Sequence, residues 1–79
     1  MNNTGSGDYV FIGGGGSNNI NGYSSNIIGG TNNDINGNTS TIAGGFNNNI
    51  SGSWSVIVGG FNNTGAGDYV FIGGGNMNE

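Results

Sequence analysis

A strict repeat of 15 residues constrains this chain more than any other feature of its sequence. Stepping by 15 from Ile12 gives isoleucine each time as far as Ile72, without insertion or deletion. The repeat can be written x-N-N-x-I-x-G-x-x-S-x-I-x-G-G, as in residues 46–60. A short fixed period is typical of a solenoid, in which each repeat forms one coil and packs on its neighbours.

Each repeat contains two short segments of alternating side-chain character, one around Ile50 and one around Ile57 in the fourth repeat, and both end in glycine. Alternation with a period of two predicts β-strands, and glycine permits the corners between them. The chain has 20 glycines and no helical periodicity, which argues against helix. We therefore expect an all-β fold, a single parallel β-solenoid domain over residues 1–79. Its coils would be residues 1–15, 16–30, 31–45, 46–60 and 61–75, followed by a short tail at 76–79.

Two residue series are expected to fill the interior and to stack about 4.8 Å apart along the rod. The predicted core ladder comprises Ile12, Ile27, Ile42, Ile57, Ile72, Ile20, Ile35 and Ile50. The residues two places before the Ile12 series, such as Ser40, are small and are expected to point inward as well. The predicted asparagine ladder comprises Asn3, Asn18, Asn33, Asn48 and Asn63. We expect each of these amides to hydrogen-bond to its copies in the coils above and below.

The outward neighbours of the Ile12 series include several large apolar residues. They are Phe11, Ile28, Val56, Val58 and Phe71, and the two phenylalanines each have glycine two positions later. An apolar stripe confined to one face usually marks association, although single apolar residues scattered on a surface are common. We therefore predict that this face packs copies of the chain into a homotrimer. The outward residues of the other segment, such as Asn36, are mostly polar and are expected to face water.

The composition leaves little chemistry to assign. The chain has no Lys, Arg, His or Cys, and its charged side chains are Asp8, Asp34, Asp68 and Glu79. Without His, Cys or Lys it lacks a good general base near neutral pH, a soft metal ligand and an activated nucleophile. The net charge of -4 argues against binding to nucleic acid or to an anionic membrane surface. We expect no enzyme activity, no catalytic or metal-binding residues, no cofactor and no membrane insertion.

Three runs of sequence resemble the repeats of trimeric autotransporter adhesin heads of the YadA type and of related phage tail-fibre segments. They are TGSGDYVFIGGG at 4–15, NGNTSTIAGGFNN at 36–48 and SGSWSVIVGGFNNTGAGDY at 51–69. The resemblance implies a left-handed β-roll whose three copies pack around an axis through one strand face. It also implies an extracellular or virion-surface location. The first residues show no signal peptide, so export would use another route. The period of 15 differs from the commoner 14 of that family.

A second resemblance concerns the motif N-N-x-I-x-G, found at residues 32–37 and 47–52. It is similar to the repeats of the grass ice-recrystallisation-inhibition proteins, which are monomeric β-rolls. The resemblance implies a monomeric ice-binding protein. Ice recognition needs a flat, regular array of small polar side chains, and the bulky Phe11 and Phe71 oppose it on one face.

Four aromatic residues, Tyr9, Tyr23, Trp54 and Tyr69, fall at neighbouring loop positions and are expected to lie along one edge of the rod. Aromatic residues are enriched at recognition surfaces, so contact with a receptor or surface glycan is one interpretation, and packing between protomers is the other. Phe46 and Phe61 are expected to stack at one corner, where packing between protomers is again favoured.

The first and fifth repeats are nearly identical. Residues 2–15 and 62–75 differ only at Ser6 against Ala66. Open strand edges on two such end coils would allow copies to stack end to end. The leading hypothesis is therefore a structural fibre protein that trimerises and polymerises. A receptor-binding adhesin head and a monomeric ice binder are the alternatives.

Overall fold

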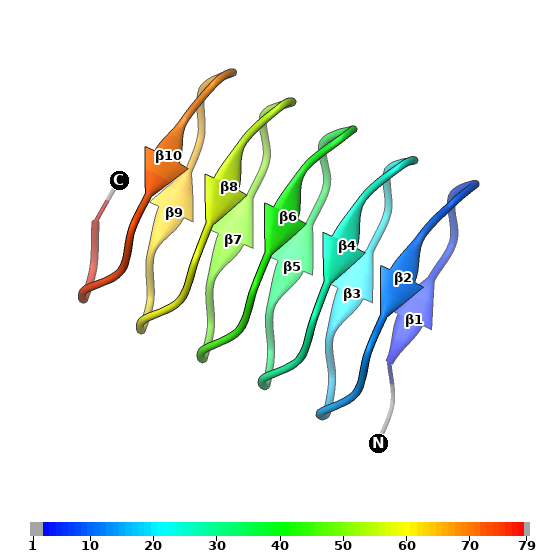
Figure 1. Cartoon of the computed structure of the whole chain (residues 1–79), viewed down its shortest axis with the longest axis horizontal. Coiled ribbons are helices and arrows are strands. Elements are labelled where there is room, and N and C mark those ends of the chain that lie inside the picture. The colour runs from blue at the N-terminus through cyan, green and yellow to red at the C-terminus, as the bar shows by residue number, and fades with distance from the viewer. Residues whose placement is uncertain (1–2, 79) are drawn as a thin grey trace.

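The computed structural model describes residues 3–78 of the chain and has ten strands of two residues each (Figure 1). The strands are β1 (Thr4–Gly5), β2 (Phe11–Ile12), β3 (Asn19–Ile20), β4 (Asn26–Ile27), β5 (Asp34–Ile35), β6 (Thr41–Ile42), β7 (Asn49–Ile50), β8 (Val56–Ile57), β9 (Thr64–Gly65) and β10 (Phe71–Ile72). Each coil contributes one odd-numbered and one even-numbered strand.

Two parallel sheets result from the stacking of these coils. The odd-numbered strands form sheet A in the order β1-β3-β5-β7-β9, and the even-numbered strands form sheet B in the order β2-β4-β6-β8-β10. Each strand residue pairs with the residue 15 positions further on, as Ile20 does with Ile35 and Ile27 with Ile42. Figure 1 shows the five coils side by side in a flat rod. The prediction of a parallel β-solenoid with a 15-residue coil is confirmed.

Isoleucine fills the space between the two sheets. The buried core consists of Ile20, Ile35 and Ile50 from sheet A and Ile27, Ile42, Ile57 and Ile72 from sheet B. Ile12, in the first coil, is only partly buried and packs against this cluster. Branched apolar side chains facing each other across two sheets supply the hydrophobic stabilisation of the fold.

Buried serines form a second series beside the isoleucines. Ser25, Ser40 and Ser55 are fully or almost fully buried. The Oγ atom of Ser40 accepts a hydrogen bond of 3.1 Å from the backbone nitrogen of Ser55 and donates one of 3.2 Å to the carbonyl of Asn38. The serine hydroxyls therefore satisfy backbone groups between successive coils, and their burial carries no unpaired polar atom.

Every coil turns at two corners, and non-glycine residues with positive φ occupy both. The first corner joins an odd-numbered strand to the next even-numbered strand, and its positive-φ residues are Tyr9, Ser24, Thr39, Trp54 and Tyr69. The second corner joins each coil to the next, and its positive-φ residues are Ser17, Asn32, Asn47, Asn62 and Met77. From the sequence the corners are assigned to glycine, and the structure shows that non-glycine residues in the left-handed conformation lie there as well.

Glycine at the first corner is required by close packing between coils. A Cβ atom built on Gly37 would overlap the carbonyl oxygen of Gly52 in the next coil, and the same overlap occurs at Gly7, Gly22 and Gly52. None of these four glycines has positive φ. Their recurrence every 15 residues therefore reflects the distance between neighbouring coils rather than an unusual backbone conformation.

Candidate interaction surfaces

The asparagine ladder lies inside the second corner. Asn18, Asn33, Asn48 and Asn63 are fully buried, and Asn3 is half-buried. The Nδ2 atom of Asn33 donates to the carbonyl oxygens of Gly29 and Gly45, both at 3.1 Å. Its Oδ1 atom accepts from the backbone nitrogen of Asn48 at 3.0 Å. These buried amides thus satisfy backbone groups that the corner leaves outside the strand ladders.

This pattern differs from the expected one, in which each asparagine side chain bonds to its copies. The amide oxygen does reach the next copy, but through that residue's backbone nitrogen, and the amide nitrogen bonds to glycine carbonyls. Asn78 continues the series, since its backbone nitrogen donates to Oδ1 of Asn63 at 2.9 Å. Sequence reasoning missed Asn78, although one further step of 15 from Asn63 reaches it.

The outer face of sheet B carries the residues predicted to form a trimer interface. Phe11, Ile28, Val58 and Phe71 are exposed there, and Val56 is half-buried. Strand pairing aligns Phe11, Asn26, Thr41, Val56 and Phe71 in one row. This row has polar residues at its centre. The neighbouring row, of Gly13, Ile28, Ala43, Val58 and Gly73, is apolar along its whole length.

The association of phenylalanine with glycine in sheet B has an explanation within one chain. A Cβ atom built on Gly13 would lie 3.1 Å from Cε2 of Phe11, and one built on Gly73 would lie 3.5 Å from Cε2 of Phe71. Each ring therefore lies over the glycine two positions later in its own coil. The sequence suggested that a large side chain paired with glycine reflects complementarity between chains. The position of the rings shows that this pairing does not require a second chain.

The outer face of sheet A is polar, and its side chains bond along the ladder. Both oxygens of the Asp34 carboxylate accept hydrogen bonds of 3.0 Å, one from Nδ2 of Asn19 and one from Nδ2 of Asn36. Ser6 Oγ donates to Oδ1 of Asn21 at 2.8 Å. Because the chain has no Lys, Arg or His, the hydrogen bonds to this carboxylate come from two amide side chains.

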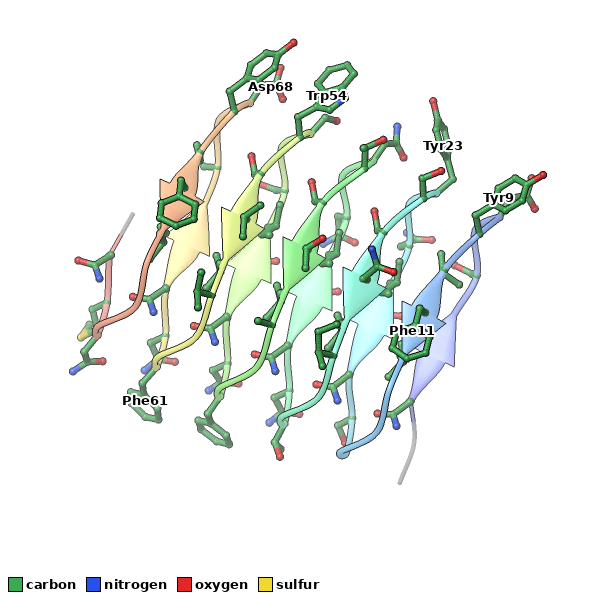
Figure 2. The ribbon with its side chains drawn as sticks, in the orientation of Figure 1. Tyr9, Phe11, Tyr23, Trp54, Phe61 and Asp68 are labelled. Atoms are coloured by element: carbon green, nitrogen blue, oxygen red, sulfur yellow. The ribbon has the colours of Figure 1, made fainter. Side chains whose placement is uncertain are left out.

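Aromatic residues gather at the corners (Figure 2). Trp54 and Tyr69 stack at the first corner, with ring centroids 5.3 Å apart and planes inclined by 9°. Tyr9 lies at the same corner in the first coil and is 87% exposed. At the second corner Phe46 and Phe61 stack at 5.2 Å, as the sequence predicts. Each stack joins adjacent coils, so both contribute to the packing of a single chain.

Tyr23 lies one residue before the positive-φ position of its coil, so it is not in line with the other three aromatic residues of the first corner. Ser24 and Thr39 occupy the aligned positions in the second and third coils. The aromatic edge predicted from the sequence is therefore divided, with Tyr9 and Tyr23 near one end of the rod and the stack of Trp54 and Tyr69 near the other (Figure 2).

Over residues 3–78 the fold encloses no pocket and brings together no group of three acidic, histidine or cysteine residues that would hold a metal ion. The same residues include no helix of the length and hydropathy needed to cross a membrane. No protein-family model and no curated protein matches the sequence. Function is therefore inferred from the residues and the fold of the chain itself.

Proposed function

We propose that this chain is a structural protein that associates with copies of itself as a homotrimer and serves as a unit of an extracellular or virion-surface fibre. The observation that carries the proposal is the exposure of large apolar side chains on the outer face of sheet B. Phe71 is 70% exposed, Phe11 53% and Ile28 52%. Contiguous apolar surface of this kind is typical of protein association.

The row of Ile28, Ala43 and Val58 forms the centre of the proposed contact. It is apolar without interruption, and its small and medium side chains allow a second sheet to approach closely. Phe11 and Phe71 flank it at the two ends of sheet B. Three copies arranged with these rows toward a common axis would remove the apolar surface from water and leave the polar face of sheet A outside.

Replacement of Val58 by Asp tests this arrangement. Val58 is exposed in the single chain, so the variant should fold, but a charge at the centre of the contact would be buried without a partner. At low protein concentration and low ionic strength, we expect the unmodified protein to have the mass of three chains by sedimentation equilibrium and Val58→Asp to have the mass of one. Ser51→Asp, on the outer face of sheet A, is the matched control and should remain trimeric. A single-chain mass for the unmodified protein would contradict the proposal.

Recognition of a receptor or glycan is a second candidate, favoured by the stack of Trp54 and Tyr69. Both rings are largely exposed, and together they extend over two coils at the first corner. Aromatic surfaces of this kind pack against the apolar faces of sugar rings. Titration with soluble oligosaccharides, followed by Trp54 fluorescence, tests it directly because the chain has a single tryptophan. A spectrum that does not change across an oligosaccharide panel would count against this candidate.

A further inference from the structure

The described fold does not itself require glycine at position 67. At the equivalent positions of the four preceding coils, a Cβ atom would overlap a carbonyl oxygen of the next coil. A Cβ atom on Gly67 would meet only Cγ2 of Val70, at 3.6 Å, which is an ordinary contact. Gly67 also lacks the positive φ that would favour glycine. Because glycine at this position allows the carbonyl of a following coil to approach closely, Gly67 would allow one more coil to pack on the far side of coil 5, residues 61–75.

We propose that coil 1 of a second copy of this chain binds there through its residues 4–15 and continues the solenoid from one copy into the next. This inference rests on the proposed self-association and deepens it by identifying a second contact, at the ends of the rod rather than on sheet B. The end contact would repeat the geometry that already joins coil 4 to coil 5. Because its two surfaces differ, it does not close on itself and generates a filament.

The backbone groups of the two end coils are complementary. In coil 4, Val56 N donates to Val70 O at 2.8 Å and Val58 N donates to Ile72 O at 2.9 Å. Phe71 and Gly73 are the equivalents in coil 5, and residues 3–78 provide no further coil to accept from them. The same register directs these two donors to the carbonyls of Val10 and Ile12 in the incoming copy.

A contact at the first corner follows from the same register. Tyr69 N donates to Ser53 O at 3.0 Å, and Ser53 N donates to Oδ1 of Asp68 at 2.8 Å. Across the end contact, Tyr9 N would donate to Asp68 O, and Asp68 N would donate to Oδ1 of Asp8. Because residues 2–15 and 62–75 are nearly identical, equivalent side chains would stack on one another across the contact, as Phe71 would on Phe11.

The described tail, residues 76–78, already forms the beginning of a further coil on coil 5. Asn78 occupies the next position of the asparagine ladder, where its Nδ2 donates to Gly74 O at 2.8 Å. Asn3 holds the equivalent position in coil 1, where its Oδ1 accepts from the backbone nitrogen of Asn18 at 3.0 Å. Asn78 and the incoming Asn3 therefore compete for one place. They are chemically identical, so Asn78 can supply the acceptor for Asn18 of the second copy.

The one unfavourable feature of the contact is electrostatic. It places the carboxylates of Asp68 and Asp8 one coil apart, about 4.8 Å by the strand spacing, and the chain has no cation to separate them. Salt screens repulsion between exposed charges. Filament formation should therefore be faster and need less protein in 0.5 M sodium chloride than in a buffer of low ionic strength.

Gly67→Ala tests the proposal, with Gly44→Ala as the matched control. A methyl group on Gly67 would enter the space of the incoming Gly7 carbonyl, whereas one on Gly44 meets nothing within 4 Å. We expect unmodified protein and Gly44→Ala to form filaments, seen by negative-stain microscopy and pelleting. Gly67→Ala should form none, while keeping the circular dichroism spectrum and thermal midpoint of the unassembled protein.

The outcomes separate the end contact from the contact through sheet B. Trimers of Gly67→Ala that do not stack would support both contacts. Filaments of single-chain width from the unmodified protein would support the end contact while refuting the trimer. The end contact is overturned if Gly67→Ala polymerises as well as the unmodified protein. It is also overturned if the unmodified protein stays unpolymerised at high concentration and high salt, which would favour a further coil of a longer chain as the occupant.

Discussion

The Oδ1 atom of Asn33 lies 3.0 Å from the backbone nitrogen of Asn48, one coil further along the chain, and accepts its hydrogen bond. The same side chain donates to two glycine carbonyls, one in the preceding coil and one in its own. One buried amide thus bonds to three backbone groups at a corner outside the two sheets. The repetition of this arrangement in every coil makes asparagine, and not only isoleucine, a determinant of the fold.

Asn33→Ala should therefore be strongly destabilising. It leaves the backbone nitrogen of Asn48 and the carbonyl of Gly29 without a hydrogen bond, while the carbonyl of Gly45 keeps the one from Thr31 N. Each unsatisfied buried group costs about 1–3 kcal/mol, so we expect a loss of at least about 2 kcal/mol in the free energy of unfolding, measured by urea titration. Asn26→Ala is the control, since the Asn26 side chain lies on the outer face of sheet B without a hydrogen bond in the described structure. Equal effects of the two substitutions would contradict the role of the ladder.

The sequence predicts the core well because a strict period of 15 fixes which residues lie above one another. Once Ile42 is placed inside, alternation places Ser40 inside and Thr41 outside, as the structure has them. The sequence also indicates a stack of Phe46 on Phe61, since equivalent positions are neighbours in space. Periodicity and alternation are thus sufficient for the architecture and its register.

The sequence did not predict contacts that depend on the direction of backbone groups. Whether Asn33 bonds to a side chain or to a carbonyl depends on where the corner leaves its backbone groups, and the repeat pattern does not contain this information. The reason for glycine at Gly37 likewise appears only when the next coil is in place. The ring of Phe11 over Gly13 shows a similar limit, because residue sizes alone do not distinguish contact within a chain from contact between chains.

Ile42→Asn should destabilise the protein far more than Asn36→Ser. Ile42 is fully buried between the sheets, where an amide would find no matched partner and the apolar contact would be lost. Asn36 is exposed and gives up one hydrogen bond to Asp34. We expect a loss of more than about 3 kcal/mol for the first variant and less than about 1 kcal/mol for the second. Similar thermal midpoints for the two would show that the inner and outer faces are assigned wrongly.

Gly37→Ala should prevent neighbouring coils from packing at their normal distance. The new methyl group would overlap the carbonyl oxygen of Gly52, which belongs to a backbone held in place by hydrogen bonds on both sides. We expect the free energy of unfolding to fall by about 2–4 kcal/mol, at or above the usual cost of overpacking, and the thermal midpoint to fall with it. Gly44→Ala adds the same methyl group to open space in the same coil and should leave the midpoint within a few degrees. A tolerated Gly37→Ala would mean that the coils are further apart than described.

Thr39→Asn should raise the stability of the chain. Thr39 has φ of 55° and a β-branched side chain, a combination that is strained for an L-residue, and its side chain is exposed without a hydrogen bond in the described structure. The left-handed conformation costs most residues about 1–2 kcal/mol, whereas asparagine adopts it readily.

The chain itself supports this choice, because asparagine occupies three of the five equivalent positive-φ positions at the second corner, Asn32, Asn47 and Asn62. We expect Thr39→Asn to gain about 1 kcal/mol, which corresponds to a rise of about 4–8 °C in the thermal midpoint for a domain of this size. Thr31→Asn, at an exposed position without positive φ, is the control and should give no gain. A midpoint that does not rise for Thr39→Asn would show that Thr39 is not held at positive φ in solution.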